Sequence, residues 1–314
     1  MIQISEKFKR TITELYARDG SEWLNNLPAL IVNCERRWAL TVGSPFLPLS
    51  YNYVAPATRA DGTRVVLKLG YPNPELRTEI EALQIYEGHG IVRLIASDIE
   101  QGILLLERLE PGTPLSRLSN AGGTSSEQAT SIAAHVMRQL WRPVPAVQVP
   151  TGNHFPTVAQ WGSGLRKLRD RFGGTSGPFP EGLVAQAEGL FTDLIASMAE
   201  PVLLHGDLHH ENILAAERQP WLAIDPKGLV GEPAYDVGAF LRNNLPQPLT
   251  TAGTRRILAR RIAQLAEQLG FDAQRLRDWG IAQAVLSAWW SLEDHGHGWE
   301  WAIACAEVLA AIKI

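Results

Sequence analysis

The stretch "LLHGDLHHENILAAERQPWLAIDPKGLVGE", residues 203–232, gathers histidines, aspartates and an asparagine in an otherwise apolar part of the chain. Two short β-prone runs, residues 212–215 and 221–224, flank a polar turn and predict a hairpin. Four residues separate Asp207 from Asn212, and Asp225 follows the second run directly. The stretch therefore predicts a functional loop followed by a hairpin whose end carries a carboxylate.

The spacing of these polar residues is that of the protein-kinase catalytic loop, H-R-D-x-x-x-x-N, with His205 in the leading position. In that loop the aspartate orients the acceptor hydroxyl and takes its proton, so we expect Asp207 to be the catalytic base. Asn212 and Asp225 are the expected ligands of a magnesium ion that bridges the ATP phosphates, because magnesium prefers hard oxygen ligands. Lys227 is a candidate for neutralising charge on the transferred phosphoryl group, although a solvated loop lysine fits its position equally well.

The first third of the sequence predicts strands around one helix. Short β-prone runs bounded by glycine or proline occupy residues 37–43, 64–70, 91–98 and 102–109. Residues 74–87 carry Leu76, Ile80 and Leu83 at helical spacing. Proline and glycine then interrupt the chain after Leu109, so we expect an N-terminal nucleotide-binding lobe, residues 1–109, and a catalytic and acceptor-binding lobe, residues 110–314.

A phosphoryl-transfer enzyme also needs a lysine for the nucleotide phosphates, and Lys68 lies inside the second β-prone run. Glu79, in the following helix, is its expected partner, and Glu81 is a rival that points to another helix face. Taken alone, such a pair is most often a surface ion pair that contributes little. Backbone groups of Glu107 and Leu109 are expected to bind adenine at the hinge.

Two interpretations from other functional classes stay open. His205 and His209 have the spacing of a two-histidine zinc site on a helix, but the glutamate of zinc hydrolases is missing and a strand follows. The chain could instead be a catalytically silent kinase-like binding protein. That class has no need of Lys68, Asp207 and both expected metal ligands together.

Helices dominate from Thr124 onward. "TSSE" predicts a capping box at Thr124, and Pro143 is expected to end that helix. Further helices are expected over residues 181–199, 255–269, 273–292 and 300–312, with a loop over residues 173–182.

"HGDLHHENI" followed by "WLAIDPKGLVGEPAYDVGAFLRN" resembles the aminoglycoside and hydroxyurea phosphotransferases, most closely the streptomycin 6-phosphotransferase group of the kinase-like superfamily. The resemblance implies an α+β fold with two kinase-like lobes, a small β-rich one and a large, mainly helical one. It implies the roles given above for Asp207, Asn212 and Asp225, and contact of Lys68 with the α- and β-phosphates. It further implies that Asp236 braces the catalytic loop.

One segment departs from the protein-kinase pattern. The glycine-rich G-x-G-x-x-G loop is replaced by "GSPFLPLSYNYVAP", residues 43–56, between the first two expected strands. The resembled family also lacks that glycine pattern. We therefore expect Ser50 and nearby backbone N–H groups to help cover the nucleotide.

The acceptor pocket is expected near "SAWWSLEDHGHGWEWA", residues 287–302. Carboxylates of Glu293 and Asp294 beside the indole of Trp290 suit a cationic ligand, since carboxylates bind guanidinium groups and tryptophan adds cation–π attraction. A cationic aminocyclitol such as streptomycin is the expected acceptor. Hydroxyurea or a cellular metabolite is the alternative, and tryptophans on helices are otherwise mostly core residues.

Composition and charge limit the classes of binding partner and the cellular location that we expect. The formal net charge is -4 and the pI is about 6.1, which argues against nucleic acid as a partner. No apolar run reaches the roughly 20 residues of a membrane span, and the N-terminus lacks a signal core, so a cytoplasmic protein is expected. The two cysteines lie far apart and predict neither a disulfide framework nor a zinc site.

Overall fold

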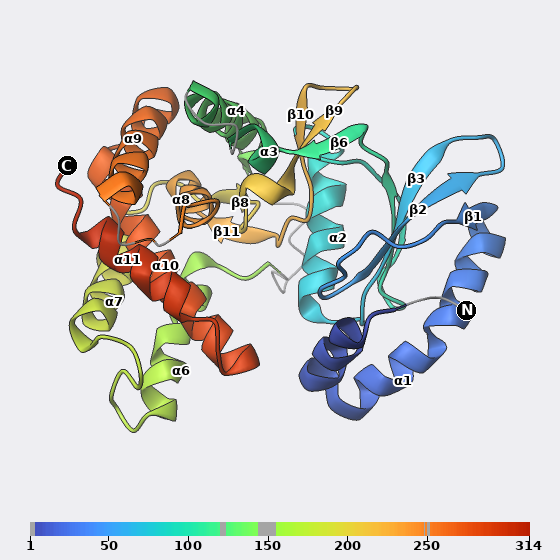
Figure 1. Ribbon diagram of the computed structural model, residues 1–314, viewed down its shortest axis with the longest axis horizontal. Coiled ribbons are helices and arrows are strands. Elements are labelled where there is room, and N and C mark those ends of the chain that lie inside the picture. Colours follow the sequence, from blue (N-terminus) through green and yellow to red (C-terminus); the bar gives the residue numbers. More distant parts are fainter. Residues whose placement is uncertain (1–3, 120–123, 144–154, 248, 250–251) are drawn as a thin grey trace. The chain divides into compact units, whose positions relative to one another are not determined.

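The computed structural model describes residues 4–119, 124–143, 155–247, 249 and 252–314 (Figure 1). The chain divides into two compact units, Met1–Gly112 and Thr113–Ile314. This division falls slightly beyond the expected boundary at Leu109. Within the described ranges, no helix combines the length and apolar character that crossing a membrane requires.

The first unit is built on one antiparallel sheet of order β1-β2-β3-β5-β4. Its strands are β1 (Leu40–Val42), β2 (Tyr53–Arg59), β3 (Arg64–Leu69), β4 (Leu94–Asp98) and β5 (Ile103–Glu107). The expected strands at residues 64–70, 91–98 and 102–109 are confirmed, with shorter bounds. Strand β2 was not among the expected strands; its Tyr53 and Ala55 alternate inward, and the strand pairs with β3.

A long N-terminal helix, α1 (Glu6–Trp38), was not expected from the sequence. It occupies the beginning of the predicted strand 37–43, so only residues from Leu40 onward are extended. The helix breaks sharply at Ala17, where φ is 48°. Gly20 lies against the carbonyl of Ile12, 2.5 Å from where a Cβ would stand, so glycine permits the chain to fold back there.

The two faces of the sheet have different partners because strand side chains alternate. Leu67 and Leu69 point into the core formed with α1. Lys68, between them, points to the opposite face, where it meets α2 (Pro74–Tyr86). The expected helix over residues 74–87 is confirmed, with Asn73 as its N-cap and Glu87 as its C-cap.

The second unit is mainly helical. Its helices are α3 (Leu115–Ser119), α4 (Thr124–Leu140), α5 (Val158–Gly162), α6 (Gly164–Arg171), α7 (Glu181–Ala196), α8 (Val237–Arg242), α9 (Ala252–Leu269), α10 (Ala273–His295) and α11 (Glu300–Ala310). The five longest agree with the predicted ranges to within a few residues. Helices α3, α5, α6 and α8 were missed, because such short segments show too little of the 3.6-residue period. The expected capping box depends on the Thr124 side chain, which lies outside the described residues.

Two small sheets accompany these helices, in the orders β10-β9-β6 and β11-β8-β7. Their strands are β6 (Pro111–Pro114), β7 (Arg142–Pro143), β8 (Val202–Leu204), β9 (Ile213–Ala216), β10 (Trp221–Ala223) and β11 (Leu229–Gly231). The expected hairpin is β9–β10, but Asn212 ends the 3₁₀ turn η1 (His210–Asn212) instead of opening the first strand. Strands β6, β7, β8 and β11 were not expected.

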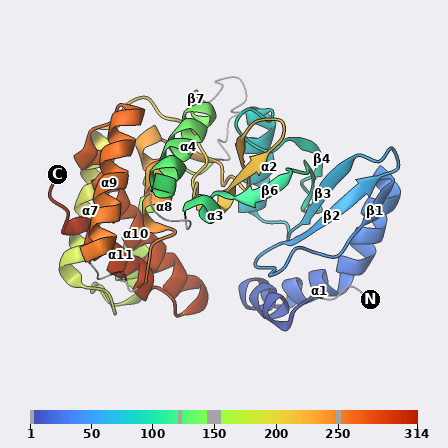
Figure 2. The same ribbon diagram turned by 45° about the horizontal axis from the view of Figure 1, so that its top comes forward.

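Helix α10 is the core of the second unit and packs against α6, α7, α8, α9 and α11 (Figure 1 and Figure 2). Every residue from Asp278 to Leu286 is buried, so all faces of this part of the helix are covered. A helix that is apolar on most of its surface is expected to be surrounded by other elements.

Candidate active site

Hairpin β9–β10 brings the two expected metal ligands to its open end. Ile213 pairs with Ala223, and the N–H of Ile224 donates to the carbonyl of Asn212 at 2.9 Å. Because this bond continues the ladder beyond the strands, Asn212 and Asp225 lie at adjacent points of the two chain segments.

Asn212 is oriented so that its amide oxygen is available. Its Nδ2 donates to the carbonyl of Asp207 at 3.0 Å, and Oδ1 makes no hydrogen bond to any described residue. Asp225 is partly buried and adopts a left-handed conformation with φ of 64°. One amide oxygen and one carboxylate fit magnesium, which takes few protein ligands and fills its shell with water and phosphate oxygens.

Asp236, in η2 (Pro233–Asp236), fixes the backbone before Asp207. Its carboxylate accepts hydrogen bonds from the N–H of Gly206 at 2.7 Å, the N–H of His205 at 3.0 Å and the indole of Trp141 at 3.2 Å. Burial raises the pKa of Asp236 to about 6, although the three N–H donors favour the charged form. The loop is braced by Asp236, as the resemblance implied.

Gly206 allows the loop to turn in a space too narrow for a side chain. Its φ is 86°, and a Cβ there would stand 3.1 Å from the Cβ of Lys227 and 3.3 Å from the indole of Trp161. The N–H of Lys227 donates to the carbonyl of His205 at 2.7 Å. Lys227 therefore contributes packing contacts to the loop as well as a positive charge.

The histidines serve the structure of the loop. His205 is fully buried, with Nε2 2.8 Å from the carbonyl of Ile224, and Nδ1 accepts from the N–H of Asp207 at 3.2 Å. Burial lowers its pKa to about 4. His209 Nδ1 accepts from the N–H of Glu211 and caps η1. Across the described ranges no group of three or more His, Cys, Asp or Glu side chains could hold a metal, which gives the zinc interpretation no support.

Asp207 pairs with a residue that the sequence analysis missed. Arg242 Nη2 donates to Asp207 Oδ1 at 2.9 Å, and His209 Nε2 lies 3.6 Å from Oδ2. Burial acts to raise the pKa of Asp207, but Arg242, His209 and Lys227 together outweigh it and leave the pKa below its usual value. Arg242 stands inside "GAFLRN", within the stretch that carries the family resemblance, but nothing local indicates that it reaches Asp207.

In the first unit, Lys68 and Glu79 form the predicted pair. Lys68 Nζ lies 2.6 and 2.7 Å from the two carboxylate oxygens of Glu79. Only 4% of Lys68 and 6% of Glu79 are exposed, so this is a buried pair and not a surface one. A lysine held in this way has a fixed ammonium position on the face of the sheet opposite α1.

The family described as "Aminoglycoside/hydroxyurea antibiotic resistance kinase" matches residues 37–295 of this sequence. The chain belongs to this family. It is 32% identical to the streptomycin 6-kinase of Streptomyces glaucescens over 94% of this chain and 92% of that protein. It is 35% identical to the hydroxyurea phosphotransferase of Kitasatospora aureofaciens over 88% of this chain and 76% of that protein. The chain is therefore a phosphotransferase of the kinase class.

Solved structures establish the protein-kinase-like fold. The choline kinase LicA from Streptococcus pneumoniae superimposes with a TM-score of 0.63 at 15% identity, over 91% of this chain and 100% of that chain. The aminoglycoside phosphotransferase APH(4)-Ia, in complex with ADP and hygromycin B, gives 0.59 at 14% identity, over 89% and 97%. At these identities the likeness concerns the fold alone.

The remaining nucleotide-binding predictions fall on the first unit of this kinase. Ser50 is exposed in the connection between β1 and β2. The N–H of Glu107 donates to the carbonyl of Arg93 at 2.9 Å, so this N–H is not available to adenine. Leu109 lies just after β5 and is largely buried. The nucleotide-binding roles of these residues stay predictions.

The predicted acceptor residues lie along α10. Trp161, near the end of α5, contacts one of them. Its ring makes an edge contact with Trp290 at 5.1 Å between centroids, and it also touches the position of Gly206 beside Asp207. Trp290 is half-buried, whereas Glu293 and Asp294 are exposed near the end of the helix. The structure thus brings Trp290 towards the catalytic loop through Trp161.

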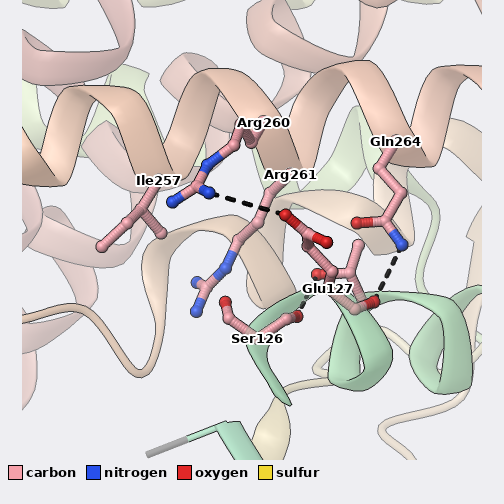
Figure 3. Close-up of a pocket in the computed structure, with 7 residues that line it drawn as sticks. Ser126, Glu127, Ile257, Arg260, Arg261 and Gln264 are labelled. Atoms are coloured by element: carbon pink, nitrogen blue, oxygen red, sulfur yellow. Dashed lines mark hydrogen bonds and ion pairs between the residues drawn. The ribbon is translucent and has the colours of Figure 1, made fainter. Parts of the chain in front are cut away.

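A pocket lies between α4 and α9 (Figure 3). Arg260 forms an ion pair with Glu127 at 3.5 Å, and Gln264 Nε2 donates to the carbonyl of Glu127 at 2.8 Å. None of the predicted site residues lines this pocket. Its contacts instead fasten α9 to the first turns of α4.

Proposed function

We propose that this kinase uses ATP and magnesium to phosphorylate a hydroxyl group of a cationic aminocyclitol such as streptomycin. The observation that carries the proposal is the braced loop and hairpin that hold Asp207, Asn212 and Asp225 together. Asp207 is the catalytic base, and Lys227 neutralises charge near the transferred group.

The nucleotide roles follow from the same chemistry. Asn212 Oδ1 and the Asp225 carboxylate would hold magnesium, whose positive charge would offset that of the nucleotide phosphates. Lys68, fixed by Glu79, binds the α- and β-phosphates. We further propose Ser50, Glu107 and Leu109 for the nucleotide, with Glu107 acting through its backbone carbonyl and not its N–H.

The acceptor class is supported by the surroundings of Trp161 and α10. Trp161 lies against Gly206 at the catalytic loop and contacts Trp290. Trp290 and Asp294 are four residues apart on α10 and so share a face, while Glu293 lies three residues from Trp290. Aromatic rings followed by carboxylates suit an extended ligand with guanidinium groups.

Hydroxyurea is the second candidate acceptor, because the 35% identical relative is a hydroxyurea phosphotransferase. Hydroxyurea is small and uncharged, so it has no cationic group to form an ion pair with the carboxylates at the end of α10. The effect of those carboxylates on turnover therefore separates the two candidates.

The decisive experiment measures ADP release by the purified protein with magnesium-ATP and one acceptor at a time: streptomycin, hydroxyurea or an uncharged sugar. We expect release with streptomycin, loss on removal of magnesium, and loss in Asp207→Asn. Glu293→Gln and Asp294→Asn should raise the acceptor KM more than the ATP KM. Release with hydroxyurea alone would transfer the proposal to that acceptor, and release with none of the three would overturn both acceptor assignments.

A further inference from the structure

Arg242 makes a forked contact that the roles above do not include. It is the last residue of α8, and its Nη2 donates to Asp207 Oδ1 at 2.9 Å. Its Nη1 donates to Gln283 Oε1 on α10, also at 2.9 Å. One planar guanidinium group therefore joins the predicted catalytic base to the central helix of the unit.

The position of the guanidinium is set from several sides. Gln283 is 3% exposed, and its Nε2 donates to the carbonyl of Tyr235 at 2.5 Å, which fixes its amide. Gly238 leaves room for that amide, since a Cβ there would stand 2.6 Å from it. The carbonyl of Arg242 in turn accepts from the indole of Trp301 at 3.4 Å. These contacts hold Arg242 in a fixed position between α8 and α10.

The contact with Arg242 gives the two carboxylate oxygens of Asp207 different hydrogen-bond surroundings. Oδ1 is held by Arg242, whereas Oδ2 accepts no hydrogen bond from a described residue, and its neighbour His209 Nε2 is 3.6 Å away. A carboxylate without such a contact rotates about its last bond. We propose that Arg242, seated by Gln283, is the positioning residue that holds Asp207 so that Oδ2 receives the proton of the acceptor hydroxyl. This inference rests on the proposed function.

The test compares Arg242→Ala, Arg242→Lys and Gln283→Met with the wild type in the ADP-release assay. We expect Arg242→Ala to lower kcat by about 10- to 100-fold, because a small misplacement of a catalytic group has effects of that order. The KM for ATP should stay nearly constant. Lysine should restore little, since one ammonium group cannot reproduce the fork, and Gln283→Met should give an intermediate loss.

Chemical rescue separates positioning from a general loss of structure. Methylguanidinium, well below denaturing concentrations, should restore part of the kcat of Arg242→Ala, and the same concentration of sodium chloride should not. Arg260→Ala, which removes an exposed arginine from α9, is the matched control and should behave like the wild type with and without methylguanidinium.

The outcomes are distinct. Wild-type kcat in a folded Arg242→Ala protein would overturn the inference. The inference would also be overturned if Arg242→Ala loses kcat and nucleotide affinity equally and methylguanidinium does not restore its kcat. If Arg242→Ala does not fold, Gln283→Met decides, and an unchanged kcat there overturns the inference. A wild-type protein that phosphorylates no acceptor would instead overturn the proposed function.

Discussion

Asp207 and Asp225 are both carboxylates of the loop and hairpin, but the proposed function gives them different tasks. Asp207→Asn should lower turnover by roughly 10²- to 10⁴-fold, the usual range for a general base, with nucleotide affinity retained. Asp225→Ala should weaken magnesium-dependent nucleotide binding as well as turnover. Nucleotide titrations with and without magnesium, next to steady-state kinetics, distinguish the two. Turnover close to wild type in Asp207→Asn would remove Asp207 from the base role.

The backbone conformation of Asp225 affects stability independently of its carboxylate. Its φ of 64° lies in the left-handed region, which costs an ordinary L-residue roughly 1–2 kcal/mol and costs glycine almost nothing. Asp225→Gly and Asp225→Ala both remove the carboxylate, so their difference isolates the backbone. Urea unfolding should show Asp225→Gly to be more stable than Asp225→Ala by about 1 kcal/mol, while both lose metal-dependent binding. Equal stability would mean that the conformation relaxes in the variants.

His205 predicts how stability depends on pH. Burial lowers its pKa from 6.5 in the unfolded chain to about 4, so the folded protein holds the neutral ring. The resulting stabilisation is complete above pH 6.5 and is lost as pH falls towards 4, at about 1.4 kcal/mol per pH unit. Burial lowers the pKa of His210 as well, which adds to the loss. The raised pKa of Asp236 acts in the opposite direction below about pH 6, so the difference in urea midpoint between the wild type and His205→Asn, from pH 7.5 to 5, measures the slope due to His205.

The control for the pH effect is a pair of substitutions. His205→Asn should be less stable at neutral pH but should show a flatter pH dependence. His297→Asn, at an exposed position, should keep the wild-type slope. A wild-type slope in both variants would assign the pH dependence to other groups.

At the scale of elements, Glu232 connects β11 to α7 and α10. It is 4% exposed, and Arg275 donates to its two oxygens at 2.8 and 2.6 Å. Trp279 donates to it as well, and Arg275 also reaches the carbonyl of Leu194 at the end of α7. The conspicuous "GLVGE" segment thus ends in a residue that orients the helices around the site.

Removing Glu232 leaves the partly buried guanidinium group of Arg275 without its carboxylate partner and removes the acceptor of the Trp279 indole. Glu232→Ala should therefore destabilise the protein by about 1–3 kcal/mol, measured by urea unfolding. Glu100→Gln, which breaks an exposed pair with Arg77, is the control and should change stability little. A small effect of Glu232→Ala would show that water readily replaces the carboxylate around Arg275.

At the scale of the whole molecule, the proposed nucleotide binding predicts that a ligand changes the stability of the protein. A ligand that binds only the folded protein raises its stability, by about 2.7 kcal/mol at 100 times Kd. Magnesium-ATP should therefore raise the melting temperature of the wild type. The shift should be lost in Asp225→Ala and in variants of Lys68.

Lys68→Met alone leaves Glu79 buried and charged, so it should destabilise the first unit as well. The double variant Lys68→Met/Glu79→Leu should recover stability but not the nucleotide-dependent shift. Recovery of the shift in the double variant would make the pair purely structural.

The sequence by itself determined the local features of this protein. The spacing from Asp207 to Asn212, the β9–β10 hairpin and the long helices α4, α7, α9, α10 and α11 depend on neighbours along the chain. The pairing of Lys68 with Glu79 also followed, because one strand and the next helix fix its geometry. Helix α1 was missed although its buried residues recur at helical spacing, since Pro28 and the break at Ala17 interrupt the pattern.

Only the tertiary structure decided which distant residues meet at the loop. Arg242 reaches Asp207 from 35 positions away, and Gln283 reaches Arg242 from 41. Trp161 approaches Gly206 because α5 packs on α7 and β11. Such contacts arise from the packing of helices against one another, and no periodicity or motif in the chain encodes the partner of a given side chain. The family motif therefore located the candidate site, while the packing of α5, α8 and α10 determined what surrounds it.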